Sequence, residues 1–257
     1  MWDLIQERTV SYDPDNAYSI NYLWGTTGLG YNEDKIKALI PDAPLDTWKL
    51  IFDPQYASKL AECGIYVLDA PTEVIPAALN YLGLDPNVIT KETLKKAEAA
   101  IEPIRPYIRK FHSSEYISAL ANGDICLALG WSGDILQASD RAKEADKGVV
   151  VKYTIPKEGT QMWFDQMAIP ADAKNKAEAY KFMNYIMQPE VIAKVSNYVS
   201  YANGNKASQA FIEKDILENP SVFPNKETLE RLFTVKTWNA KEQRWANRTW
   251  TKIKSGR

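Results

Sequence analysis

Apolar residues along positions 64–145 follow two different periods. Residues 64–68 and 125–131 are nearly continuous apolar runs, and the longer run is typical of a strand that is covered on both faces. The segments around these runs predict helices over residues 71–82, within 90–108, over 115–121 and over 133–145. Because strands and helices alternate here, the pattern predicts an α/β sheet.

Polar residues mark where two of these helices begin. Asp69 stands where an N-cap is expected, with a proline in the first turn and Glu73 shortly after it. Ser113 or Ser114 is expected to cap the helix over 115–121. Glu73 has two interpretations. It either complements the positive end of the helix or faces a ligand cleft from a strand-to-helix loop.

Residues 19–32 read as one extended segment that contains three glycines. Their spacing fits neither the dinucleotide-binding fingerprint nor the P-loop. We interpret the segment as a glycine-bearing strand that crosses between two lobes. Residues 149–155 and 162–169 are also extended and are expected to cross back. Helices are predicted over 172–187, over 190–199 and in most of 206–257.

An aromatic residue stands close to an aspartate at two places. Trp131 precedes Asp134 after the strand at 125–131, and Trp163 precedes Asp165 in the second extended segment. The face of an aromatic ring attracts an organic cation and covers its methylenes. A carboxylate supplies the opposite charge and accepts the hydrogen bonds of an ammonium group. The two pairs therefore indicate a ligand with two cationic ends.

Composition excludes several classes of protein. The 257 residues are 45% hydrophobic and 25% charged, as in ordinary globular proteins. A net charge of -2 implies no broad basic face for nucleic acid or anionic lipid. No apolar run approaches the roughly 18 residues of a membrane span. The first residues resemble no signal peptide, which by itself indicates a cytoplasmic protein.

The single histidine, His112, argues against a catalytic triad or a metal centre. We expect it to have a structural role, and we expect no metal and no cofactor. Acid–base catalysis by Asp134, Asp165 or Glu73 stays open, because paired carboxylates beside tryptophans also describe glycoside hydrolases.

The chain has two cysteines, and each lies at a predicted strand. If those strands are neighbours, Cys63 and Cys126 can form a disulfide, which would indicate an oxidising compartment. The alternative is two buried free thiols, which are common in protein cores. The residues by themselves favour the free thiols.

Motifs distributed over essentially the whole chain resemble the periplasmic polyamine-binding proteins of ABC transporters, most of all those that bind putrescine. These motifs are G-T-T-G-L-G-Y-N, L-D-A-P-T-E-V, F-H-S-S-E-Y-I-S-A-L-A-N-G-D-I-C, G-W-S-G-D, I-P-K-E-G, A-D-A-K-N-K-A-E-A-Y-K-F, Y-A-N-G-N and W-T-K-I-K-S-G-R. The resemblance implies a type II periplasmic-binding-protein fold, in which two α/β lobes joined by crossing strands close over the ligand.

The resemblance also implies a set of ligand-binding residues. The matching positions are Glu73, Trp131, Asp134, Trp163, Asp165, Tyr201 and, with a weaker match, Ser113. Trp163 stands where the putrescine-binding members usually have phenylalanine, so the cavity is expected to be narrower or shifted there. Cys63 and Cys126 match positions that resemble a disulfide pair in this family, which reverses the preference for free thiols.

The resemblance implies a division of the chain into two lobes. Residues 20–148 with 205–257 would form a complete second lobe, and residues 1–19 with 149–204 would form a first lobe. In the family a signal peptide and a strand–helix segment of the first lobe precede the position that Met1 matches. We therefore expect a truncated first lobe whose uncovered apolar surface favours self-association.

The expected function is non-catalytic capture of putrescine or a related polyamine in the periplasm, for delivery to an inner-membrane ABC transporter permease. One ammonium group would lie near Asp134 with Glu73 close by, and the other near Asp165. Trp131, Trp163 and Tyr201 would cover the methylenes. The alternatives are a truncated lobe fragment that binds little or no ligand and, more remotely, a glycoside hydrolase.

Overall fold

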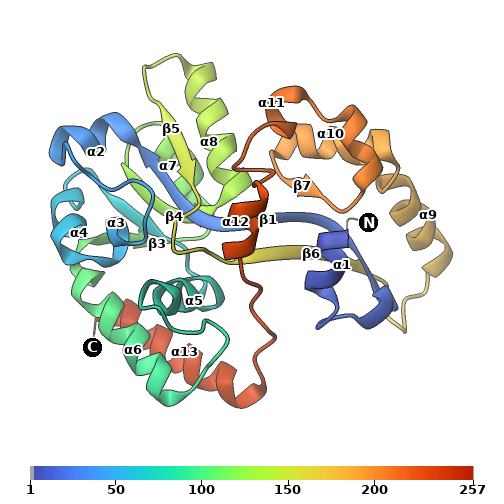
Figure 1. Cartoon of the computed structure of the whole chain (residues 1–257), viewed down its shortest axis with the longest axis horizontal. Helices are drawn as coiled ribbons and strands as arrows, with labels where there is room; N and C mark the ends of the chain where they lie inside the picture. The colour runs from blue at the N-terminus through green and yellow to red at the C-terminus, as the bar shows by residue number, and fades with distance from the viewer. Residues whose placement is uncertain (1–2, 257) are drawn as a thin grey trace.

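One long strand connects two packed regions of the chain (Figure 1). The computed structural model describes residues 3–256. Strand β1 (Ser19–Asn32) has 14 residues and pairs antiparallel with four other strands. Its C-terminal half belongs to the sheet of the larger lobe, and its N-terminal half belongs to the sheet of the smaller lobe. The two lobes therefore share a continuous backbone ladder.

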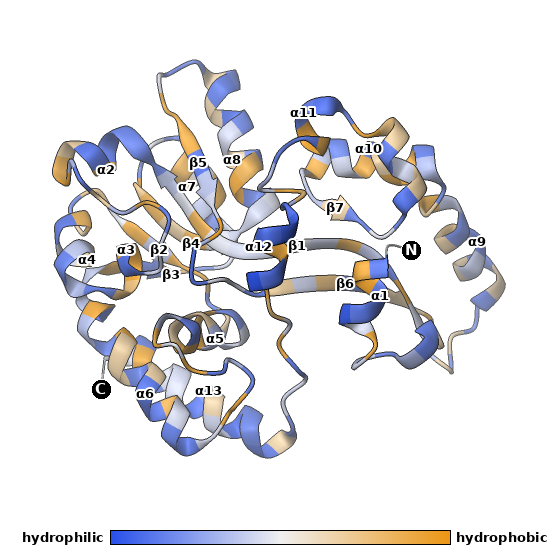
Figure 2. Cartoon of the chain, in the orientation of Figure 1, coloured by the Kyte–Doolittle hydropathy of each residue, from blue (hydrophilic) through white to orange (hydrophobic). Residues whose placement is uncertain are grey.

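The larger lobe contains a sheet with the strand order β3-β2-β4-β1-β5. Strand β2 is parallel to β3 and β4, whereas β4 and β5 are antiparallel to β1. The strands are β2 (Ile65–Val67), β3 (Ile108–Phe111), β4 (Leu127–Trp131) and β5 (Val151–Thr154). The hydropathy colouring shows hydrophobic residues on these strands, most visibly on β5 (Figure 2). The α/β sheet predicted from the alternating pattern is confirmed.

Helices surround this sheet. They are α2 (Glu33–Leu39), α3 (Lys49–Phe52), α4 (Pro54–Leu60), α5 (Pro71–Tyr81), α6 (Lys91–Ile101), α7 (Glu115–Ala121), α8 (Ser132–Ala145), α13 (Ala240–Ser255) and the 3₁₀ helix η2 (Glu102–Tyr107). Helices α7 and α8 pack on β1 and β4, while α5, α6 and α13 pack on one another. The core of this lobe includes Trp48, Tyr116 and Trp250.

The smaller lobe is built on β6 and β7, which pair with the N-terminal half of β1. Its elements are α1 (Asp3–Thr9), η1 (Pro14–Asn16), β6 (Met162–Ala168), α9 (Lys176–Ile186), α10 (Pro189–Val199), β7 (Ala202–Asn203), η3 (Lys206–Phe211), α11 (Lys214–Leu217) and α12 (Lys226–Arg231). Its own core contains Ile5, Trp24, Met162, Val222 and Leu232. Two separate cores support the two-lobe architecture.

The lobe boundaries stay a prediction, and the two cores lead us to refine it. Val222, Leu229 and Leu232 pack with the smaller core, whereas Trp238 and the buried face of α13 pack with the larger one. We therefore propose that the C-terminal segment, expected above to belong entirely to the larger lobe, changes lobes near residue 233. The expected truncation of the smaller lobe also stays a prediction.

Of two predicted helix caps, one is wrong and the other is right only in its position. The Asp69 carboxylate does not cap α5, because it accepts hydrogen bonds from the indole Nε1 of Trp250 (2.8 Å) and from Nζ of Lys254 (2.7 Å), both on α13. Ser114 is the N-cap residue of α7, as expected, but no serine hydroxyl makes the cap hydrogen bond. Instead, Nδ1 of His112 accepts the backbone N–H groups of Ser114 and Glu115 at 3.2 and 3.1 Å. The expected structural role of His112 is thus to cap this helix.

Cys63 and Cys126 form a disulfide with their Cα atoms 5.5 Å apart. Each cysteine lies next to a strand, and β2 and β4 pair in parallel with Ile65 opposite Leu127. This pairing brings together two residues that are 63 positions apart in the sequence. The disulfide implied by the family resemblance is confirmed, and the preference for free thiols is wrong.

Helix α9 contains no buried residue, and three of its aromatic side chains are exposed: Tyr180, Phe182 and Tyr185. The side of β6 opposite β1 pairs with no other strand among residues 3–256. Exposed aromatic surface and an open strand edge both favour association. Self-association stays a prediction.

Within the described part of the chain, no helix combines the length and apolar composition that a membrane crossing requires.

Removing the disulfide should lower stability. A Cys63→Ala/Cys126→Ala variant leaves a chain with no cross-link, so the unfolded state gains conformational freedom. For a closed loop of this length the chain-entropy model gives a loss of about 4 kcal/mol in the free energy of unfolding. Urea unfolding of the oxidised protein and of the variant measures the difference. Wild-type protein reduced with dithiothreitol is the control, and unchanged midpoints in both samples would contradict the prediction.

Candidate ligand-binding site between the lobes

Side chains from both lobes line a cavity of about 320 Å³. Its lining residues are Glu73, Trp131, Trp163, Asp165 and Tyr201. Glu73 lies in the first turn of α5 and Trp131 ends β4, so the larger lobe contributes from the carboxyl side of its parallel strands. This is where α/β sheets place their ligands. Trp163 and Asp165 come from β6, and Tyr201 precedes β7.

The register of β1 fixes the two tryptophans relative to each other. Thr27 pairs with Trp131 of the larger lobe, and Gly25 pairs with Trp163 of the smaller lobe. Two residues along a strand span about 7 Å. A single strand thus sets the spacing between aromatic groups that are 32 positions apart in the numbering of the chain.

Trp163 can lie against β1 because residue 25 is glycine. A Cβ atom at Gly25 would be 2.7 Å from the indole ring of Trp163, which is too close. On its other side the indole meets Tyr201 edge-on, with the ring centroids 5.2 Å apart and the planes at 68°. Such edge-to-face pairs are favourable and hold both rings in place. The result is a fixed aromatic wall beside Asp165.

Glu73 is a buried carboxylate at this cavity. It accepts a hydrogen bond from the Thr27 hydroxyl at 2.5 Å and one from Nε2 of Gln161 at 3.4 Å. Burial raises the pKa of Glu73, although hydrogen bonds from the Thr27 and Trp131 side chains act in the opposite direction. A positive charge entering the cavity would relieve the cost of ionising this group.

Asp165 is the second carboxylate of the cavity, and it is the more exposed of the two. Partial burial raises the pKa of Asp165. Its backbone is held in place because Nδ2 of the buried Asn21 donates to the Asp165 carbonyl oxygen at 3.0 Å. The side chain therefore projects from a fixed point on β6, next to the aromatic wall.

Asp134 lies directly behind the wall of the cavity and is not among its lining residues. One carboxylate oxygen, Oδ2, accepts the hydroxyl of Tyr116 at 2.7 Å, and Oδ1 accepts the hydroxyl of Tyr201 at 2.8 Å. The negative charge is thus one side chain away from the cavity. Direct contact between Asp134 and a ligand stays a prediction.

Ser113 bonds to a loop of the larger lobe. Its hydroxyl oxygen accepts the backbone N–H of Asp69 at 3.1 Å, in the loops that follow β2 and β3. It is not among the lining residues of the cavity. A role for Ser113 in ligand binding stays a prediction.

The sequence did not identify Tyr116, Thr27 or Gln161 as members of this site. Tyr116 and Leu120 are four positions apart and both are buried, so the helical period of α7 marks Tyr116 only as a core residue. Thr27 and Gln161 reach Glu73 from β1 and from the segment before β6. No local pattern connects these positions to Glu73.

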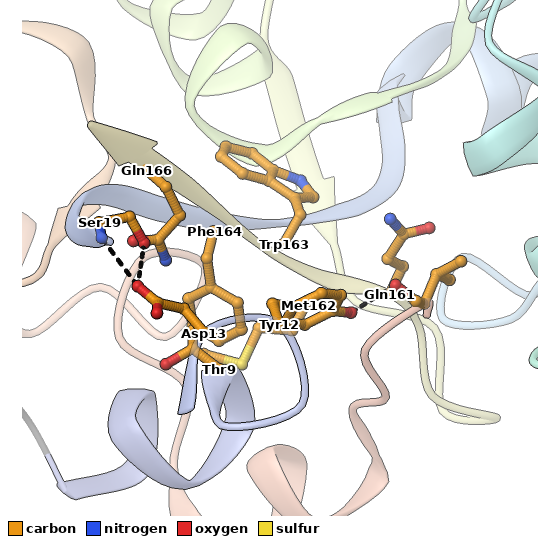
Figure 3. A pocket seen from close by; sticks show the side chains of 10 residues that line it. Thr9, Tyr12, Asp13, Ser19, Gln161, Met162, Trp163, Phe164 and Gln166 are labelled. Atoms are coloured by element: carbon orange, nitrogen blue, oxygen red, sulfur yellow. Dashed lines mark hydrogen bonds between the residues drawn. The ribbon is translucent and has the colours of Figure 1, made fainter. Parts of the chain in front are cut away.

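A second cavity, of about 270 Å³, lies against the other face of β6 (Figure 3). Met162, Phe164 and Tyr12 gather there, and Trp163 also lines this cavity although its indole points away from them. Its carboxylate, Asp13, already accepts the backbone N–H and the hydroxyl of Ser19 at 2.8 and 2.7 Å. Both cavities thus share Trp163, but Glu73 and Asp165 line only the first one.

The part of the chain that the structure describes contains no candidate metal-binding site. There, no three His, Cys, Asp or Glu side chains are grouped closely enough to hold a metal ion.

Comparison with known proteins identifies relatives over nearly the whole chain. Residues 4–224 match the family model described as bacterial extracellular solute-binding protein. The chain is 50% identical over 248 residues to the putrescine-binding periplasmic protein PotF of Escherichia coli strain K12. This match covers 96% of the chain and 67% of the relative. It is 49% identical over 256 residues to the putrescine-binding periplasmic protein SpuD of Pseudomonas aeruginosa, covering 99% of this chain and 70% of the relative.

Solved structures agree on the fold. A putative spermidine/putrescine ABC transporter from Listeria monocytogenes superposes with a TM-score of 0.83 at 30% identity, over 99% of this chain and 76% of the other. The substrate-binding protein PotD of Streptococcus pneumoniae superposes with a TM-score of 0.81 at 23% identity, over 100% of this chain and 74% of the other. The second comparison supports the fold alone.

Glu73→Gln should make the ligand-free protein more stable than wild type at pH 8. The raised pKa of Glu73 means that the folded protein holds this proton more tightly than the unfolded chain does. The contribution of Glu73 to stability is therefore complete below its unfolded pKa and is lost as the pH rises through its folded pKa. Glutamine avoids this loss and still offers an acceptor to Thr27.

Urea unfolding of both proteins at several pH values from 4 to 8.5 checks this expectation. The free energy of unfolding of the variant should exceed that of wild type by an amount that increases with pH. Exposed Glu62, changed to Gln, serves as the matched control for the loss of one carboxylate at the surface. If the difference in free energy of unfolding between Glu73→Gln and wild type were the same at every pH, Glu73 would not be a buried carboxylate whose charge is poorly compensated.

Proposed function

The chain belongs to the bacterial extracellular solute-binding proteins, and from this membership we propose that it captures putrescine or a related polyamine for uptake by an inner-membrane ABC transporter. The ligand is bound and released without chemical change. The observation that carries the proposal is a cavity between two lobes that is lined by two carboxylates, those of Glu73 and Asp165, together with aromatic rings from both lobes.

A diammonium ligand matches this arrangement. One ammonium group binds at the inner end, beside Glu73 and Trp131, with the charge of Asp134 behind Tyr201. The other binds beside Asp165. Each ammonium group brings three donors and a full positive charge, and a site that closes away from water must pair both. Trp131, Trp163 and Tyr201 cover the methylene chain and add cation–π attraction.

Closure of the two lobes brings these groups onto the ligand. Glu73 and Trp131 belong to the larger lobe, and Trp163, Asp165 and Tyr201 belong to the smaller one. The lobes are connected by β1, by the return segment between β5 and β6 and by the C-terminal segment near residue 233, and these three crossings act as the hinge. A bound cation stabilises the closed arrangement because only there does it meet carboxylates from both sides.

We further propose that the protein works in the periplasm and there meets an ABC transporter permease. Its relatives PotF and SpuD are named as periplasmic proteins. The Cys63–Cys126 disulfide supports this location, because disulfides persist in oxidising compartments.

Titration calorimetry with putrescine and with butylamine tests the proposal. Putrescine should bind, and butylamine should bind at least about tenfold more weakly, because it leaves one carboxylate without a cation. Asp165→Asn should weaken putrescine binding by about 2 kcal/mol, the typical value of a hydrogen bond to a charged group, and should narrow the difference between the two amines.

Asp172→Asn removes one exposed charge outside the cavity and is the matched control. Equal affinity for the two amines would disprove the two-ended assignment. No heat with any polyamine would favour a fragment without binding activity, and turnover of a glycoside would favour the hydrolase alternative.

A further inference from the structure

We propose that Tyr116 is a positioning residue for ligand binding, which acts by holding the Asp134 carboxylate and the backbone of Trp131 in place whether the lobes are open or closed. The proposal rests on the proposed function in one respect, namely that Asp134 and Trp131 serve a cationic ligand. The interactions themselves are independent of any ligand.

Tyr116 makes two hydrogen bonds through one hydroxyl. The hydroxyl donates to Oδ2 of Asp134 at 2.7 Å and accepts the backbone N–H of Trp131 at 3.2 Å. The side chain is completely buried in the core of the larger lobe. It therefore connects the end of β4 to the first turn of α8, the two elements that present Trp131 and Asp134.

The fit of the Tyr116 ring depends on the strand below it. A Cβ atom at Gly130 would be 2.6 Å from the ring, so only glycine allows the ring to pack on β4 at this point. Burial raises the pKa of Tyr116, and the neighbouring Asp134 raises it further. The phenol consequently stays protonated and remains a hydrogen-bond donor throughout the physiological pH range.

Tyr201 holds the other oxygen of Asp134, but from the opposite lobe. Its hydroxyl donates to Oδ1 at 2.8 Å and accepts the backbone N–H of Asp134 at 3.2 Å. Its ring lies on Gly133, where a Cβ atom would be 2.6 Å away. The carboxylate is thus held between two phenols, one in each lobe.

This difference in location gives the two tyrosines different roles. The bond from Tyr116 lies within the larger lobe and persists when the lobes separate. The bond from Tyr201 crosses between the lobes, so separation of the lobes would break it. Tyr116 therefore keeps the carboxylate oriented for an arriving cation, and Tyr201 adds stability to the closed state.

Stopped-flow fluorescence with putrescine, using Tyr116→Phe and Tyr201→Phe, separates these roles. Tyr116→Phe should lower the association rate constant about tenfold, because Asp134 and Trp131 lose their orientation before the ligand arrives. Tyr201→Phe should mainly raise the dissociation rate constant. Tyr116→Phe that lowers Tm but leaves both rate constants unchanged would reduce Tyr116 to a structural residue and overturn the proposal.

A double-mutant cycle tests the connection to Asp134 without any ligand. Tyr116→Phe should lower the urea concentration at the midpoint of unfolding. This decrease should be much smaller in an Asp134→Ala background than in wild type. Tyr153→Phe is the matched control, because Tyr153 is a buried tyrosine of the same lobe whose hydroxyl bonds to Thr26 at 2.7 Å. Its effect should be the same in both backgrounds.

Additive losses for Tyr116→Phe and Asp134→Ala would overturn the proposal. The two experiments also distinguish its failure from that of the proposed function. If the wild type binds no putrescine, the polyamine assignment fails, while the unfolding cycle still decides whether Tyr116 holds Asp134.

Discussion

The pairing of β1 with four other strands is the constraint on which the site depends. Because this strand belongs to both sheets, its register decides which residues of the larger lobe face which residues of the smaller one. Thr27 pairs with Trp131 and also donates to Glu73, while Gly25 pairs with Trp163 two residues away. Two neighbouring positions on the same face of β1, Gly25 and Thr27, thus position three of the five cavity residues, namely Glu73, Trp131 and Trp163. A shift of one residue in this register would turn the side chain of Thr27 away from Glu73 and would move Gly25 away from Trp163.

The chemistry of the cavity is a compromise between stability and binding. A carboxylate that is buried without a cation is costly, and the raised pKa of Glu73 reflects that cost. The cost is also what gives an entering ammonium group a large gain, since it restores the missing charge. Asp134 represents the other solution. Two phenols satisfy its oxygens, so its charge can remain near the cavity at a smaller cost to the ligand-free protein.

A long-range partner in one case and a neighbouring histidine in the other explain why the capping rules failed. Asp69 has the sequence context of an N-cap, but α13 brings Trp250 and Lys254 to its carboxylate from more than 180 residues away. The histidine ring of His112 then provides the cap that a serine hydroxyl was expected to provide. In both cases the helix begins close to the predicted position, because local signals such as a proline and the apolar period determine where a helix begins. Which polar group satisfies the first turn is decided by the side chains that packing places nearby.

The sequence by itself determined the elements and the chemical character of the site. Periodicity predicted the α/β sheet and the crossing strand at residues 19–32, since local sterics and the burial pattern act over a few residues. The aromatic–aspartate pairs indicated a ligand with two cationic ends, because cations need that combination of side chains. Only the tertiary structure decided that Glu73 faces the cavity while Asp134 lies behind Tyr201, and that Tyr116 holds it. Those facts depend on the angle between two lobes and on contacts between residues up to 88 positions apart, such as Glu73 and Gln161, which no local pattern encodes.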